Sequence, residues 1–390
     1  MSVYEYERIK HFRVVYIFPF VISTFDDKQA AFGAAFSHQM IRNLMLLNDV
    51  SIRGPEDTPR IESDRIDGIL GRANLQFVTG DVSRQGSLWN LNYSVYKNGQ
   101  RAAEGNVTEK DFLKFVRACT EKLAKAIGSN GVPTKSDAWD KGQSPSVQAM
   151  LKYGSLLRNR ESLNKRQKSA KAIELLKSEP EFSLPAWQMD NDFPECRPWY
   201  FEVLKRDPYD VQTCFEAFCS VSAGGKSEPH AVQFCRRAIE LSPGHGKAHM
   251  CAPHSAHPDV NMLRHSHLGY VLLQANTFAV TNYVHYLRKY GASADSLIGL
   301  ANEGIANDPY DPAPYQHMID LFISLQEWRA ALAVAVELQK LFEPEIHPRA
   351  LYCLRQSPNV KKQLEDGQYD PAAHNRRLID YIRSKAESIS

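Results

Sequence analysis

The chain of 390 residues lacks a long apolar run, because no stretch approaches the 18 consecutive apolar residues that suggest a membrane-spanning helix. It also lacks an excess of charge, since 47 Lys and Arg stand against 45 Asp and Glu and the net charge is +2. That balance gives no reason to expect a nucleic-acid partner. The composition, 43% hydrophobic and 24% charged, is ordinary for a soluble globular protein of two or three domains.

Cysteine pairs at redox or zinc spacing are also lacking. The seven cysteines are an odd number and include no CxxC pair, which favours a reduced, cytoplasmic protein. The apolar run at residues 14–22 follows basic residues, as in a signal peptide, but Pro19 interrupts it and no small-residue cleavage motif follows. We therefore expect a buried strand here and a cytoplasmic location.

Complete catalytic motifs are missing as well. The sequence contains no nucleophile elbow G-x-S-x-G, no complete Walker phosphate loop, no H-E-x-x-H and no dinucleotide fingerprint. We therefore expect a protein that is not an enzyme and that uses no cofactor. Binding is the function class that these absences favour.

Residues 1–128 alternate between strand and helix patterns. The strands are expected at 13–18, 50–52, 75–82, 88–96 and 102–107, and the helices at 29–47, 61–70 and 111–127. Gly86 and the pair Asn98-Gly99 mark two hairpin turns, because Gly and Asn tolerate the positive φ angles that such turns need. In the strand at 88–96, Asn92 and Ser94 alternate with apolar residues, which predicts one buried and one wet face.

A proline recurs through residues 147–390, at Pro208, Pro243, Pro309 and Pro344, with intervals of 35, 66 and 35 residues. Each follows a helical stretch, and the middle interval is close to two steps of 33, although the slot near 276 has no proline. A period of about 34 residues is typical of tetratricopeptide (TPR) helix pairs. Such pairs stack into a solenoid whose concave side holds other molecules.

Both halves resemble known families. Pro19-Phe20 ends a strand, a helix and a short strand follow, and a later strand reads FVTGDV at 77–82; this order resembles the N-terminal domain of TolB and TolB-like domains. The run AMLKYG at 149–154, followed by SAKAIELL at 169–176, is similar to a first TPR repeat. One departure is that Val21-Ile22 prolong the apolar run, where relatives usually carry a polar loop.

The resemblance implies a two-part region of the kind found in bacterial adenylate cyclases and winged-helix regulators, and it carries over no catalytic residue. We therefore expect an α/β N-terminal domain with a mixed, TolB-N-like sheet at 1–128, a linker rich in Gly, Ser and Pro at 129–146, and an all-α TPR-like solenoid at 147–390. The output would come from a separately encoded effector or from self-assembly, so a homo-oligomer stays open.

The main hypothesis is a non-catalytic protein-binding scaffold or sensory module of a bacterial signalling assembly, with a protein or peptide in the TPR groove. Most aromatic residues of the repeats should pack between helices, but some could serve as binding anchors. The candidate anchors are Tyr310, Tyr315, Trp328, Tyr283 and Tyr286.

Two alternatives remain open. One is an envelope (periplasmic) assembly protein that works as TolB does. The other is a metal-binding sensor or enzyme that uses the His-rich segment 245–267, since imidazole and thiolate suit zinc or copper. The candidate ligands are His245, His249, Cys251, His254 and His257. A lengthened loop with partly solvated histidines accounts for the same residues.

Overall fold

A computed structural model describes residues 1–20, 27–54, 75–140, 146–159, 162–222, 229–255, 261–273, 276–355 and 358–388. The chain divides into two compact units, a first unit of Met1–Leu272 and a second unit of Leu273–Ser390. Among the helices in these ranges, none is both long and apolar enough to cross a membrane.

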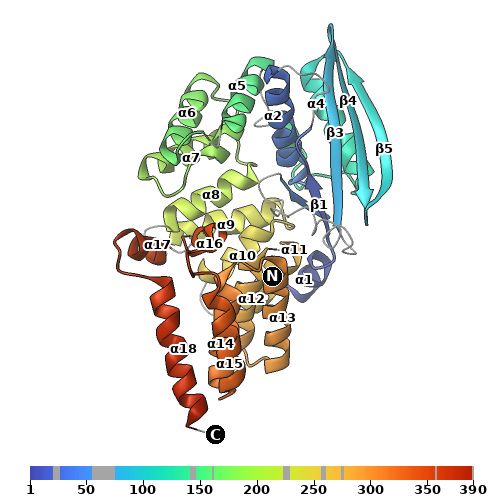
Figure 1. The fold of residues 1–390 in the computed structure, drawn as a ribbon. Coiled ribbons are helices and arrows are strands. Elements are labelled where there is room, and N and C mark those ends of the chain that lie inside the picture. Colours follow the sequence, from blue (N-terminus) through green and yellow to red (C-terminus); the bar gives the residue numbers. More distant parts are fainter. Residues whose placement is uncertain are drawn as a thin grey trace. The chain divides into compact units, whose positions relative to one another are not determined.

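The first unit contains a mixed five-stranded sheet in the order β2-β1-β3-β4-β5 (Figure 1). Its strands are β1 (Arg13–Ile17), β2 (Val50–Arg53), β3 (Leu75–Gln85), β4 (Leu88–Lys97) and β5 (Gln100–Glu109). β1 pairs in parallel with β2 and β3, whereas β3, β4 and β5 are antiparallel. The mixed α/β sheet and both hairpins are confirmed: Gly86 has φ 61°, and Asn98 and Gly99 have φ 51° and 75°. The helix expected at 61–70 lies outside the described residues.

One face of the sheet packs on helices α2 (Asp27–Leu44) and α4 (Phe112–Ala126). The alternation along β4 is confirmed, because Leu91 and Val95 are buried in this core while Asn92 is exposed. Gly80 and Gly105 are needed on the core face: an added Cβ would lie 2.7 Å from the Phe20 ring at Gly80, and 2.6 Å from the Tyr93 ring at Gly105. The aromatic rings occupy the space that the glycines leave.

The rest of the first unit is helical. Its helices are α1 (Val3–Ile9), α5 (Val147–Arg158), α6 (Lys165–Ser178), α7 (Arg197–Arg206), α8 (Val211–Ser222), α9 (Pro229–Leu241), α10 (Gly246–Ser255) and α11 (Asn261–Leu272), with short 3-10 turns η1 (Ala138–Asp140), η2 (Leu184–Gln188) and η3 (Pro194–Cys196). Consecutive helices pack as pairs, α5 on α6, α8 on α9 and α10 on α11. The expectation of a helical region from 147 onward is confirmed in this coarse sense.

Helix α2 joins the sheet to these helices, because it packs on β1, β2 and α4 and also along α5 (Figure 1). The crossing of α2 and α5 is very close: a Cβ added at Gly154 would lie 1.8 Å from the backbone carbonyl oxygen of Ala31. Only glycine allows the two backbones to approach this far. The α/β part and the first helices are therefore packed on one another without an intervening gap.

The segment expected as an exposed linker at 129–146 is anchored at several of its described positions, although Val132 and residues 135–137 are exposed. Thr134 donates its hydroxyl to the carbonyl oxygens of Leu46 (2.9 Å) and Leu241 (2.8 Å). The indole N–H of Trp139, a side chain only 2% exposed, donates to the carbonyl oxygen of Asn43 at 2.8 Å. Composition indicated turns but not burial. The two compact units instead divide after Leu272, near the slot at 276 that lacks a proline.

The second unit consists of helices that pack in succession. They are α12 (Thr277–Lys289), α13 (Ala294–Asn307), α14 (Pro312–Ser324), α15 (Trp328–Gln339), α16 (Pro348–Leu354), α17 (Pro358–Glu365) and α18 (Pro371–Glu387). Each of α12 to α15 packs on the next, and α18 packs along α15. Ala331 and Ala335 on α15 and Ile382 on α18 form part of its core. Asn375 crosses this contact by donating its amide to the carbonyl oxygen of Ala335 at 2.9 Å.

Candidate functional site

The junctions between helix pairs have a common construction. The sequence Asp-Pro-Tyr-Asp occurs at 207–210 and again at 308–311. Its last residue caps the following helix in both places: Asp210 accepts the N–H of Thr213 (2.9 Å), and Asp311 accepts that of Ala313 (3.0 Å). His245 takes the same place in Ser-Pro-Gly-His, accepting the N–H of Ala248 on its Nδ1 at 3.1 Å. These turns explain the recurring prolines, because each follows a helix end and precedes a cap.

The first aspartate of each Asp-Pro-Tyr-Asp junction binds an arginine from a distant element. Arg42 on α2 places Nη2 at 2.8 and 2.7 Å from the two carboxylate oxygens of Asp207. Arg349 on α16 places Nη2 at 2.6 Å from Asp308. The Arg42–Asp207 pair is 1% and 2% exposed, whereas the Arg349–Asp308 pair is 40% and 14% exposed. Only the Arg42–Asp207 pair is removed from solvent. Breaking it should therefore lower the free energy of unfolding more than breaking the Arg349–Asp308 pair.

Further hydrogen bonds complete a buried network around Arg42. Its Nη1 donates to Asn43 Oδ1 and to the carbonyl oxygen of Ala138, both at 3.0 Å. Asp210 accepts the indole N–H of Trp187 at 2.9 Å. Burial raises the pKa of Asp210, and the nearby carboxylate of Asp207 adds to the shift. Because Arg42, Asp207 and Asp210 are nearly or fully inaccessible to solvent, this network fixes α2 to the helices and does not offer a group to a ligand.

The five aromatic residues expected as anchors lie in the second unit and are mostly engaged in packing. Tyr286 is 5% exposed and therefore buried; Tyr283, Tyr310, Tyr315 and Trp328 are half-buried. Tyr310 stacks on His347 with ring centroids 3.9 Å apart, and Tyr315 donates its hydroxyl to the carbonyl oxygen of Pro309 at 3.0 Å. Trp328 lies edge-on to Tyr381 instead. The structure thus brings Tyr310 and Tyr315 to one junction and places Trp328 beside α18.

Other apolar side chains of the second unit are more exposed than these anchors. Six large apolar side chains are at least 40% exposed: Phe278, Tyr290, Leu325, Val336, Tyr352 and Tyr381. In the longer first unit the comparable described side chains are Val3, Tyr4, Leu113 and Val132. A helical-wheel reading would not have found Phe278, because it lies four and eight residues before the buried Asn282 and Tyr286 on α12 and so shares their face.

Two of the described histidines at 245–267, His245 and His249, make hydrogen bonds at the junction before α10. His245 caps α10 with Nδ1, and its Nε2 lies 3.4 Å from the amide oxygen of Gln212. His249 donates Nε2–H to the carbonyl oxygen of Pro243 at 2.8 Å, so its Nδ1 accepts the Nδ1–H of His265 at 2.8 Å. Burial raises the pKa of Cys251 to about 12, which keeps it a thiol. Both ring nitrogens of His245 and of His249 thus have protein partners.

The proposed metal ligands are not brought together as a set. The side chain of His254, and His257 altogether, lie outside the described residues. Within the described ranges, no group of three or more His, Cys, Asp or Glu side chains is arranged to hold a metal ion. The packed positions of His245 and His249 account for these residues without a metal.

His249 is expected to make the stability of the first unit depend on pH. Burial, with a smaller contribution from His265, lowers the pKa of His249 to about 3, whereas an unfolded histidine titrates near 6.5. Between these two pKa values, the unfolded state therefore binds a proton at this histidine that the folded state does not bind. The free energy of unfolding decreases as the pH drops below about 6.5. We expect a loss of about 2 kcal/mol between pH 7 and pH 5 from this residue.

Urea unfolding followed by tryptophan fluorescence at several pH values checks this prediction, because four of the five tryptophans lie in the first unit. The variant His249→Asn should show a shallower fall of stability between pH 7 and pH 5 than the wild type. Exposed His11 offers the control, and His11→Asn should keep the wild-type slope. An unchanged slope in His249→Asn would contradict the assignment.

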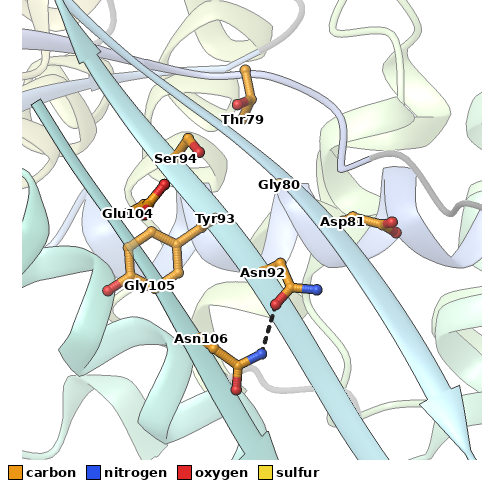
Figure 2. A pocket seen from close by; sticks show the side chains of 9 residues that line it. All are labelled: Thr79, Gly80, Asp81, Asn92, Tyr93, Ser94, Glu104, Gly105 and Asn106. Carbon is orange, nitrogen blue, oxygen red and sulfur yellow. Dashed lines mark hydrogen bonds between the residues drawn. The ribbon is translucent and has the colours of Figure 1, made fainter. Parts of the chain in front are cut away.

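The outer face of β3, β4 and β5 is hollowed and polar. A hollow of about 650 Å³ is lined by Thr79, Gly80, Asp81, Asn92, Tyr93, Ser94, Glu104, Gly105 and Asn106 (Figure 2). Asn106 donates its amide to Asn92 Oδ1 at 2.6 Å, and Thr108 donates to Asn106 Oδ1 at 2.9 Å. The alternation in β4 predicted that Asn92 and Ser94 face solvent. The sequence did not show that Asp81 and Asn106 lie beside Asn92, because strand register decides that.

These surfaces differ in whether a ligand could reach them. The Arg42 network and the His249–His265 pair are engaged within the protein, whereas the exposed apolar side chains of the second unit and the polar hollow of the sheet are open to solvent.

No protein-family model matches the chain, and no curated protein matches it.

Proposed function

We propose that this protein is a non-catalytic scaffold or sensory module of a bacterial signalling or regulatory assembly, and that a protein or peptide partner binds its second unit. The concentration of exposed apolar side chains there carries the proposal, with Phe278, Tyr290, Tyr352 and Tyr381 as the aromatic members. Rigid aromatic rings are efficient anchors for a protein or peptide partner when they are exposed to solvent.

We further propose that the helices belong to a TPR-type array and that the sheet is TolB-N-like. The helix pairs and the repeated Asp-Pro-Tyr-Asp turns at 207–210 and 308–311 support the first point. The order β1–α2–β2, which follows the short helix α1 and is followed by two hairpins, supports the second. In such an array the partner would lie along the groove formed by successive pairs.

The packing of the first unit bears on how binding could be transmitted. A rearrangement across residues 129–146 is disfavoured, because Thr134 and Trp139 are held by hydrogen bonds to the sheet part and α9. A partner can shift an equilibrium only by its different affinities for the two states. We therefore assign any such equilibrium to the two compact units, which divide after Leu272.

Affinity capture with matched variants tests the proposal. The binding variant changes Phe278, Tyr290, Tyr352 and Tyr381 to serine, and the control variant changes Val3, Tyr4, Leu113 and Val132 of the first unit to serine. We expect the four aromatic anchors together to contribute at least about 1.4 kcal/mol to the binding free energy, which corresponds to a tenfold change in Kd. The binding variant should therefore recover at least about tenfold less of the specific partner at sub-saturating concentration.

Both variants should first be shown to keep the helical circular dichroism and the unfolding midpoint of the wild type. The control variant should recover the partner as the wild type does. Equal recovery by all three proteins, or loss of the partner in the control alone, would contradict binding through the second unit.

A further inference from the structure

The polar hollow on the outer face of the sheet is built from two rows of side chains that cross three strands. Register places Asp81 opposite Asn92, and Asn92 opposite Asn106. The neighbouring row is Thr79, Ser94 and Glu104. Rows on one face of a sheet lie about 7 Å apart and strands about 4.8 Å apart, so six polar groups cover an area of about 7 by 10 Å.

The amides in this grid have defined orientations. The dashed contact in Figure 2 is the hydrogen bond from Asn106 Nδ2 to Asn92 Oδ1, and it turns the Nδ2 of Asn92 away from Asn106 toward the side of Asp81. Asn106 Nδ2 also donates to Asn90 Oδ1, and Thr108 donates to both Asn90 and Asn106. This network fixes the rotamers before any ligand arrives, which lowers the entropy cost of binding.

The charges around the hollow restrict the class of ligand. Asp81 and Glu104 are carboxylates, and Arg101 pairs with Glu104 at 2.9 Å. None of the nine residues lining the hollow is basic, and Arg101 beside it is engaged by Glu104, so the lining itself supplies no cation for a phosphorylated or other anionic ligand. The lining consists of hydroxyl and amide groups, which can both donate and accept hydrogen bonds, and of carboxylates, which accept them.

We propose that this hollow binds an uncharged, polyhydroxylated ligand, a mono- or disaccharide unit. Each sugar hydroxyl both donates and accepts, so it can use an amide N–H and a carboxylate or carbonyl oxygen on adjacent strands. The carboxylate of Asp81 and the amide of Asn92, opposite each other across β3 and β4, would bind a pair of neighbouring hydroxyls. Ser94 and Thr79 would contact the next hydroxyls along the sheet.

Saturation-transfer-difference NMR on the full chain tests the proposal, with maltose, cellobiose, lactose and N,N′-diacetylchitobiose as neutral probes. Glucose 6-phosphate and trilysine serve as the anionic and cationic arms. At least one neutral disaccharide should bind, glucose 6-phosphate should not, and Asn92→Ala and Asn106→Ala should each weaken binding of that disaccharide about tenfold. The control Gln85→Ala, at the exposed end of β3 outside the hollow, should bind as the wild type does.

The outcomes separate the proposal from its rivals. Absence of binding by all four disaccharides overturns it, and so does binding that persists unchanged in both asparagine variants. Binding of trilysine alone would show a site for cationic peptides and would also overturn it. The variants can be compared because their unfolding midpoints are measured beside the wild type. None of these outcomes depends on the second unit, so the scaffold proposal is tested separately.

Discussion

Replacing Arg42 by alanine is expected to destabilise the first unit by about 3–5 kcal/mol. The substitution leaves the carboxylate of Asp207 buried at 2% exposure with its bidentate partner removed, and the nearby Asp210 carboxyl adds to the repulsion. It also removes the hydrogen bonds to Asn43 and Ala138. Urea unfolding followed by tryptophan fluorescence measures the loss.

An exposed ion pair of the same unit gives the control. Lys205 pairs with Glu202 at 2.6 Å on the surface of α7, with side chains 69% and 43% exposed. Lys205→Ala should cost less than about 1 kcal/mol, because water and salt screen such pairs. In addition, the double variant Arg42→Met, Asp207→Leu should recover part of the loss, since it leaves no buried charge unpaired at this position. Equal losses in Arg42→Ala and Lys205→Ala would show that the buried pair does not hold α2 to the helices.

Replacing Gly154 by alanine is expected to cost about 3 kcal/mol or more, at the upper end of what overpacking does. The added Cβ would lie 1.8 Å from the carbonyl oxygen of Ala31 and 2.3 Å from its carbonyl carbon. Both are backbone atoms, so no side-chain rotation can relieve the clash, and α2 must move away from α5. Thermal unfolding followed by tryptophan fluorescence should show the first unit melting at a lower temperature.

Gly299 supplies the matched control for this glycine. It lies inside helix α13, and a Cβ added there meets no atom within 4 Å. Gly299→Ala should therefore stabilise the second unit by about 0.5–1 kcal/mol through helix propensity alone. If Gly154→Ala were instead as mild as Gly299→Ala, the close approach of α2 and α5 would be wrong.

The sequence predicted the local parts of the fold well. The hairpins followed from Gly86 and Asn98-Gly99, because positive φ angles are a local requirement of the turn. The recurring prolines indicated helix ends, and the junctions at Pro208 and Pro309 have the expected turns. In each case the determining interactions lie within a few residues of one another.

The long-range parts of the fold could not be predicted in the same way. Arg42 and Asp207 are charged, and charged residues are mostly exposed, so nothing local indicates that they form a fully buried pair. The burial of Trp139 in a Gly- and Ser-rich stretch depends on its hydrogen bond to Asn43 across the chain. Likewise, the division after Leu272 reflects packing density between helices, which composition does not report.

The candidate sites show the same limit. The sequence singled out Tyr286, which the structure buries, because aromatic content alone does not distinguish packing from exposure. It gave His249 as a candidate metal ligand in one alternative hypothesis, whereas its two ring nitrogens face Pro243 and His265. The wet face of β4 was predicted from its alternation, but the grid of polar groups that crosses three strands depends on register.

The scaffold proposal joins these features into one expectation. The first unit is held together by the Arg42–Asp207 pair and the contact at Gly154, whereas the second unit presents the exposed aromatic side chains. A partner should therefore bind the second unit and leave the hydrogen bonding of the sheet unchanged. Amide hydrogen exchange reports both effects at once, because it measures protection along the whole chain.

Hydrogen exchange of the complex obtained by affinity capture, compared with the free protein, is the most direct measurement. The scaffold account predicts new protection within residues 277–388, around Phe278, Tyr352 and Tyr381, and unchanged exchange in β1 to β5. Protection confined to residues 1–272, with none in the second unit, would contradict it.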